Sequence, residues 1–152
     1  MKHSISAVLP AYLRDSKEEA LKADLQTVQN YLDETDLKLD TPTLYFVPLR
    51  GIYAHIDRKM AITGIIINRH EKPVSELALT IRLKTDVTDM EIAIVKLALP
   101  PDFVGNLLTN QALLISLSVP VRGLTEDKTF EAFQFQSELD NVKIIEASEA
   151  EG

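Results

Sequence analysis

The residues of this 152-residue chain that could do chemistry are its three histidines and its scattered serines and carboxylates. His55 and Asp57 stand two positions apart, and such a pair can supply two ligands to a metal ion. No second histidine or carboxylate pair at ligand spacing accompanies them, so we expect no metal and no other cofactor. His55 then reads as a strand-end histidine beside a polar turn. His70 falls in a charged turn, where water would surround it.

Motifs for covalent catalysis and phosphate binding are absent. A serine nucleophile needs a G-x-S-x-G elbow or an S-x-x-K set, and the chain has neither. The five glycines are scattered, and no cysteine is present, which excludes thiolate chemistry. The carboxylate-rich stretch 33–40, DETDLKLD, lacks the central glycine of a calcium loop. We expect no catalytic residue, and a small hydrolase or metal-dependent enzyme stays only as an alternative.

Charge and hydropathy exclude several classes of binding partner and a membrane-spanning segment. The net charge is −7 and the isoelectric point is near 4.9, without a Lys/Arg cluster, so neither nucleic acid nor an anionic membrane surface is an expected partner. No apolar run reaches the about 18 residues that a membrane span needs. The stretch ISAVLPAYL is short, is broken by Ser6 and Pro10, and lacks a small-x-small cleavage site after it. We therefore predict a cytoplasmic protein without membrane insertion.

An amphipathic helix is predicted from Ser16 to about Glu34. Its apolar residues follow helical spacing, and Ser16 with Glu19 three positions later forms a capping-box start. The apolar stripe would pack on its own domain or on another chain. Its members are Leu21, Leu25, Val28 and Leu32.

From Thr43 onward the apolar period changes to two, which indicates half-buried strands. In one strand Leu77, Leu79, Ile81 and Leu83 should face the core while Arg82 and Lys84 face water. In another, Ser116 and Ser118 lie opposite the apolar row, as ordinary sheet surface or as a place where another strand or sheet approaches closely. Pro120 cannot donate to a ladder, so it indicates an edge or a strand end. Other candidate strands are 44–53, 60–68, 92–99, 129–136 and 142–145.

These patterns predict a mainly β fold: a single antiparallel β-sandwich, Ig-like, of six or seven strands, with one N-terminal amphipathic helix. The chain would form one domain, with residues 1–40 as a helical extension, 41–146 as the sandwich and 147–152 as a disordered acidic tail. A phase slip after Ile92 suggests a β-bulge. Gly64 in mid-strand suggests a bulge or a close backbone approach. Residues 61–68 and 74–84 look like adjacent antiparallel strands joined by the exposed turn RHEKP.

The pattern AITGIIINRHEKPVSELALTIRLKTD carries Thr63-Gly64, a closing Asn68 and a charged turn that ends in Lys72-Pro73-Val74. It resembles bacterial β-sandwich modules of the SLAP and FxLYD type, which belong to S-layer assembly and envelope-associated proteins. The preceding LRGIYAHID is similar to the first strand of a SLAP-type module. SLAP proteins carry a pair of modules without the N-terminal helix, and this chain departs from them in both respects. The resemblance implies a non-catalytic interaction module linked to protein export or to S-layer and envelope assembly.

Sheet edges are where such a module could bind, because an edge accepts an extended peptide or a second copy. The segment TLYFVPLR is apolar without alternation, so it is buried on both sides or forms an exposed apolar patch. We expect a non-catalytic protein-binding or accessory module whose partner is another protein or a homo-oligomer. A self-assembling structural protein, such as a dimer, is the alternative. The candidate interaction edge consists of Leu44, Tyr45, Phe46, Val47 and Pro120.

Overall fold

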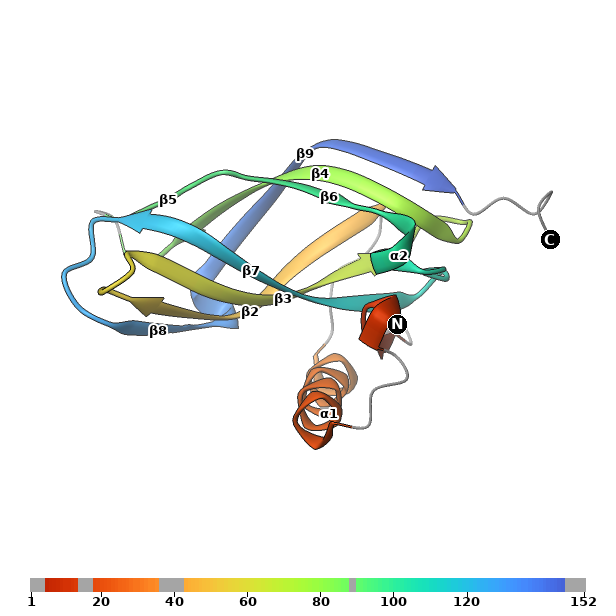
Figure 1. The fold of residues 1–152 in the computed structure, drawn as a ribbon, viewed down its shortest axis with the longest axis horizontal. Coiled ribbons are helices and arrows are strands. Elements are labelled where there is room, and N and C mark those ends of the chain that lie inside the picture. The colour runs from red at the N-terminus through yellow and green to blue at the C-terminus, as the bar shows by residue number, and fades with distance from the viewer. Residues whose placement is uncertain (1–4, 14–17, 36–42, 88–89, 147–152) are drawn as a thin grey trace.

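The computed structural model describes residues 5–13, 18–35, 43–87 and 90–146. The protein is mainly β, with two sheets and one long helix, as the sequence predicts (Figure 1). The elements in chain order are β1 (Ser6–Val8), η1 (Ala11–Leu13), α1 (Glu19–Glu34), β2 (Leu44–Ala54), β3 (Lys59–Asn68), β4 (Val74–Thr85), β5 (Glu91–Ile92), β6 (Val95–Leu99), α2 (Pro101–Val104), β7 (Gln111–Arg122), β8 (Lys128–Glu131), η2 (Ala132–Gln134) and β9 (Phe135–Glu146).

Two sheets face each other, and α1 lies beyond the larger one (Figure 1). Sheet A has the order β1-β7-β3-β2-β8, with β5 also paired to β7, and sheet B has the order β6-β4-β9. Every pair is antiparallel except β1 with β7. The chain passes from one sheet to the other after β3, β4, β5, β6 and β8. This arrangement is consistent with the predicted β-sandwich.

The alternation predicted in β4 is confirmed. Leu77, Leu79, Ile81 and Leu83 are all 5% exposed or less and belong to the core between the sheets. Arg82 is exposed, and its Nε donates to Asp140 Oδ2 at 2.6 Å. The register follows because an apolar row buried on one face leaves the intervening residues to the other face.

The prediction that residues 61–68 and 74–84 are neighbouring strands is wrong. β3 pairs with β2 and β7 in sheet A, whereas β4 pairs with β6 and β9 in sheet B, so the turn between them crosses from one sheet to the other. Asn68 braces this corner: its Nδ2 donates to the Leu107 and Lys72 carbonyl oxygens at 3.0 and 3.2 Å, and its Oδ1 accepts from the His70 N–H at 2.8 Å. Asn68 is fully buried, so these bonds satisfy an amide that would otherwise destabilise the core.

Sheet A is buried on both faces where α1 covers it. Ile62, Ile66 and Phe46 lie in the core between the sheets, whereas Ile65 and Ile67 pack in a second cluster with α1. Two-sided burial explains why this stretch of β3 does not alternate in hydropathy.

Gly64 lies at a close approach and opposite a β-bulge. The register of β2 shifts between Pro48, which stands opposite Gly64, and Arg50, which stands opposite Thr63. A Cβ at Gly64 would lie 2.6 Å from Phe46 Cε1 and 3.0 Å from the Val47 carbonyl oxygen. The Phe46 ring therefore occupies the space that a side chain at Gly64 would need. Both features that the sequence raised for Gly64 are therefore present: a bulge, which lies in the neighbouring strand β2, and a close approach.

Helix α1 packs on its own chain. Val28 and Leu32 are buried in the cluster beneath the helix, and Leu21 and Leu25 are half-buried. Gln29 ties the helix to β1, because its Nε2 donates to the Ile5 carbonyl and its Oε1 accepts from the Ala7 N–H. The helix begins at Glu19, with Glu18 at the N-cap and no side-chain cap. The predicted cap residue Ser16 lies outside the described residues.

Strand boundaries differ from the expectation in two places. The phase slip after Ile92 is a change of sheet rather than a bulge, because β5 pairs with β7 in sheet A and β6 pairs with β4 in sheet B. The expected strand 129–136 divides into β8, η2 and the start of β9, and β9 continues through the expected strand 142–145. The sequence indicates that the N-terminal arm, residues 1–14, can pair as a strand with its own sheet or with a neighbour's, and residues 6–8 of this arm form β1 in sheet A of the same chain. The described residues form nine strands, against the six or seven expected, and the acidic tail 147–152 lies outside them.

Within the part of the chain that the structure describes, no helix is long and apolar enough to cross a membrane.

Candidate functional site

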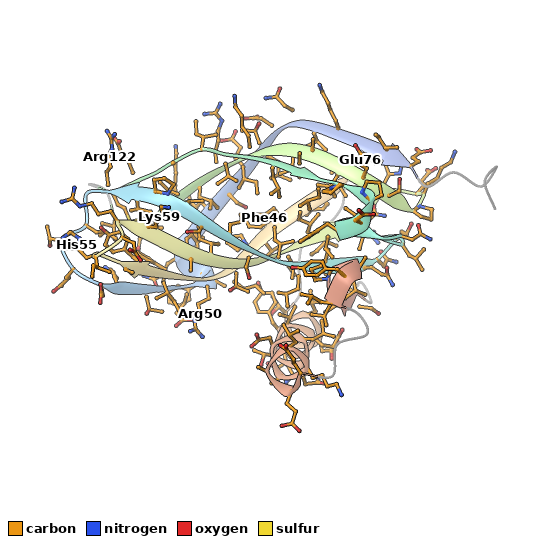
Figure 2. All side chains as sticks on the ribbon, in the orientation of Figure 1. Phe46, Arg50, His55, Lys59, Glu76 and Arg122 are labelled. Atoms are coloured by element: carbon orange, nitrogen blue, oxygen red, sulfur yellow. The ribbon has the colours of Figure 1, made fainter. Side chains whose placement is uncertain are left out.

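The predicted interaction edge in β2 is divided between the two faces of sheet A. Leu44 and Phe46 are buried in the core between the sheets, as Figure 2 shows for Phe46. Tyr45 and Val47 are half-buried on the other face, against the cluster beneath α1. The side chains of residues 44–47 are therefore divided between the core of the sandwich and the cluster beneath α1, and the segment is not an exposed apolar patch.

Pro120, the fifth residue of that edge, lies at the opposite end of sheet A. It stands opposite Lys59 in β3, whereas Leu44 stands opposite Asn68 at the other end of the same strand. The structure thus does not bring the five residues together. The Pro120 carbonyl accepts a hydrogen bond from Ala93 N–H at 3.0 Å.

His55 and Asp57 lie in the turn between β2 and β3. They are therefore not on one face of a strand, where the two side chains would lie side by side as ligands of a metal ion. His55 Nδ1 lies 3.0 Å from the Tyr53 hydroxyl, and the His55 N–H donates to Asp127 Oδ1 at 2.8 Å. Among the described residues no three His, Cys, Asp or Glu side chains gather as they would around a metal ion. These contacts give His55 a structural role at the end of the sandwich.

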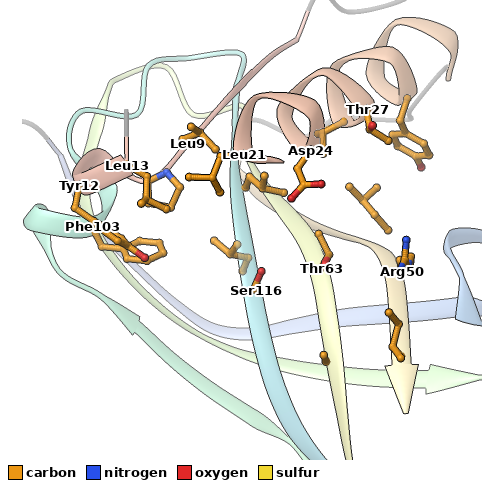
Figure 3. Close-up of a pocket in the computed structure, with 18 of the residues that line it drawn as sticks. Leu9, Tyr12, Leu13, Leu21, Asp24, Thr27, Arg50, Thr63, Phe103 and Ser116 are labelled. Carbon is orange, nitrogen blue, oxygen red and sulfur yellow. The ribbon is translucent and has the colours of Figure 1, made fainter. Parts of the chain in front are cut away.

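A concave feature lies on the outer face of sheet A, in the angle between the sheet, α1 and η1 (Figure 3). We call it the α1 groove. Its volume is about 600 Å³, within the range of ligand-binding pockets. One wall is helix α1, with Leu21, Asp24, Thr27, Val28 and Tyr31. The other wall is the segment that contains η1, with Leu9, Pro10, Tyr12 and Leu13. The floor is sheet A, with Leu49, Arg50, Ile52, Ala61, Thr63, Leu114 and Ser116.

Short side chains on the sheet floor create this space. Helix α1 packs over Ile65 and Ile67, but farther along the same face β3 and β7 present Ala61, Thr63 and Ser116. These three side chains do not fill the angle between helix and sheet. The groove is therefore a consequence of where large side chains stop on one face of sheet A.

The polar groups of the groove are few and come from different walls. Arg50 points from β2 toward the side of α1 (Figure 2), and it forms no ion pair among the described residues. Asp24 comes from α1 and Glu131 from the end of β8. Burial against the sheet raises the pKa of Tyr31 above its ordinary value.

The groove lining is mostly apolar. Ser116 is the one serine that lines the groove, and no histidine accompanies it there to act as a base. The described histidines lie elsewhere, His55 in the β2–β3 turn and His70 in the β3–β4 turn. A mostly apolar concavity with a few separated polar groups can hold an apolar chain segment and fix its orientation.

The sequence did not predict the α1 groove. One sequence signal pointed to its position, the small hydroxyl side chain at Ser116 opposite the apolar row of its strand. This signal could not identify which helix would lie over which strands. That placement depends on contacts between segments far apart in the chain.

Comparisons with protein-family models, with curated proteins and with solved structures found no match. The resemblance to SLAP and FxLYD modules therefore stays a prediction from the residue pattern.

Proposed function

We propose that the protein is a non-catalytic binding module that holds an extended, apolar-rich segment of another protein in the α1 groove. The observation that carries this proposal is the groove itself, with apolar walls from α1 and η1 over a floor of short side chains. An extended segment can lie in such a groove with its backbone close to Ala61, Thr63 and Ser116, because these side chains are short. Burying apolar surface then provides most of the binding free energy.

The sequence pattern in β3 and β4 extends the proposal to a biological setting. Through its likeness to SLAP and FxLYD modules, we place the protein as an accessory factor in bacterial protein export or in S-layer and envelope assembly, acting in the cytoplasm. We also propose an Ig-like variant of the two-sheet fold. The repeated passage of the chain between the two sheets supports this relation.

The test uses a chain that stays unfolded, reduced and carboxymethylated α-lactalbumin carrying a fluorescent label. Thr63→Trp would fill the floor of the groove, and Thr129→Trp is the matched control. Thr129 lies in β8, opposite Ile52 of β2 and on the same face of sheet A as Ile52, but it does not line the groove. We expect the wild-type protein to raise the anisotropy of the label, Thr63→Trp to weaken binding about tenfold, and Thr129→Trp to weaken it less than about twofold.

Three results would contradict the proposal. The first is no binding by the wild-type protein, and the second is equal weakening by Thr63→Trp and Thr129→Trp when both retain the wild-type circular dichroism spectrum. The third is light scattering that shows stable self-association with the groove closed to the labelled chain. That last result would favour the self-assembling structural protein instead.

A further inference from the structure

One edge of β7 is interrupted. On the side away from β3, β1 pairs with residues 111–113 and β5 pairs with residues 121–122. Between them, residues 114–120 have β3 on one side and no strand on the other among the described residues. We call this gap the β7 notch; Figure 1 shows β5 beside the far end of β7. At about 3.3 Å per residue the notch is about 23 Å long.

Hydrogen bonds at both ends show which backbone groups face the notch. The Val121 N–H donates to the Arg58 carbonyl on the β3 side, whereas the Pro120 carbonyl accepts from Ala93 on the β5 side. Because successive residues of a strand direct their N–H and C=O groups to opposite sides, Ser116 and Ser118 face the notch. Neither residue has a backbone hydrogen-bond partner there among the described residues. Four backbone groups, two donors and two acceptors, are thus available to another chain.

Pro120 fits this arrangement. Its missing N–H would point to the notch side, so no bond to β3 is lost. The edge position that the sequence indicated for Pro120 therefore applies to one side of β7 only.

The notch has an apolar inner wall. Leu117 faces the interior of the sandwich but is half-buried, whereas Ile115 and Val119 on either side are 3% exposed. Across the opening, Val95 and Leu97 of β6 are half-buried as well. A strand added beside β7 would place alternate side chains against these three residues and the others outward.

The notch also differs in charge from the free edges of β6, β8 and β9. Proteins protect exposed edges with charged residues. β6 carries Lys96, β8 carries Lys128 and Glu131, and β9 carries Glu138 and Lys143. The notch presents Ser116, Leu117 and Ser118, none of which is charged. Its middle therefore lacks the charges that protect an edge, and Pro120, at the end nearest β5, is the one edge-blocking residue of the notch.

We propose that the β7 notch binds a short extended segment of a partner protein by strand addition, with the segment forming hydrogen bonds to the backbone of Ser116 and Ser118. The inference rests on the proposed binding function and adds the form of the ligand, a strand with alternating apolar and small polar residues. A second copy of β7 is excluded as the occupant, because β1 and β5 fill the plane beside both ends of the 12-residue strand. The notch admits a segment of about five to seven residues.

The test measures hydrogen exchange with and without a peptide probe. The probe is a capped peptide of six alternating threonine and valine residues, to which two lysines are added at the C-terminal end. In the free protein the amides of Ser116 and Ser118 should exchange about a hundredfold faster than those of Leu117 and Val119, which bond to β3. Saturating peptide should slow exchange at the two serines alone. Slow exchange at Ser116 and Ser118 in the free protein would overturn the inference.

Variants separate backbone pairing from side-chain contact. Ser116→Pro removes the N–H that the peptide needs, and Ser116→Ala keeps it. We expect Ser116→Pro to weaken peptide binding about tenfold and Ser116→Ala less than about twofold. If Ser116→Pro does not fold, Ser118→Pro and the exchange measurement carry the test.

The outcomes distinguish this inference from the proposed function. If proline and alanine variants bind the peptide equally, strand addition is wrong while a binding function stands. If the peptide and the unfolded α-lactalbumin chain both fail to bind the wild-type protein, both proposals fall.

Discussion

Replacing Gly64 by alanine should destabilise the protein, because the Phe46 ring occupies the place of the new methyl group. The added Cβ would lie 2.6 and 2.7 Å from Phe46 Cε1 and Cζ, about 1 Å inside the usual carbon–carbon contact distance. It would also lie 3.0 Å from the carbonyl oxygen of Val47, on the strand that pairs with β3. Relief therefore requires the ring to move within the core or the two strands to separate.

The magnitude follows from two opposing terms. Overpacking of a well-packed core costs about 1–3 kcal/mol. Alanine also restricts the unfolded chain more than glycine does, which stabilises the folded state by about 0.4–1 kcal/mol. The net loss should be about 1–2 kcal/mol of unfolding free energy. For a chain of this size, that loss lowers the melting temperature by about 2–8 °C.

A double-mutant cycle tests the cause. Phe46→Leu removes the ring atoms that clash, so Gly64→Ala should cost at least about 1 kcal/mol less in the Phe46→Leu background than in the wild type. Urea denaturation followed by circular dichroism measures the four free energies. Additive effects within about 0.3 kcal/mol would refute the assignment of the clash to Phe46. An unchanged stability of Gly64→Ala alone would refute the close approach itself.

Two further predictions concern groups that the fold buries. Asn68→Ala removes three hydrogen bonds at the β3–β4 corner and should lower the unfolding free energy by about 2–4 kcal/mol; an unchanged urea midpoint would show that the corner does not need this brace. Burial raises the pKa of Tyr31, so its stabilising contribution is complete below the ordinary value of 10.0 and is lost as the pH rises through the raised pKa of the folded state. Tyr31→Phe should therefore lose less stability than the wild type between roughly pH 9 and pH 11, and equal losses in denaturant titrations would contradict this.

The sequence predicted which residues face the core in those strands that bury one face only. In β4 the intervening residues Arg82 and Lys84 reach water, so alternation was visible and the register was correct. In β3, Ile66 lies in the core between the sheets, whereas Ile65 and Ile67 lie in the cluster beneath α1. Apolar and polar residues therefore do not alternate in this run. Such a run signals burial on both faces, but it does not say whether a helix or another sheet provides the second layer.

Partners of strands were harder to predict than strands. A charged five-residue turn can join neighbouring strands or carry the chain to the facing sheet, because five residues can span more than the about 10 Å between sheets. Here the chain crosses to the facing sheet, and at this crossing the buried amide of Asn68 donates a hydrogen bond to the Leu107 carbonyl of a distant segment. The α1 groove and the β7 notch share this difficulty, since both depend on where α1, β1 and β5 dock on sheet A.

Ser116 connects the two proposed binding surfaces. Its backbone faces the β7 notch, and its side chain lines the floor of the α1 groove. A segment added at the notch would run beside Ser116, which lines the groove together with Tyr12 (Figure 3). One extended ligand could therefore use both surfaces, with backbone bonds at the notch and apolar contacts in the groove. In that case the threonine–valine peptide should displace labelled α-lactalbumin, and Thr63→Trp should weaken the longer chain more than the peptide. Simultaneous binding of both probes to one molecule would instead show two independent sites.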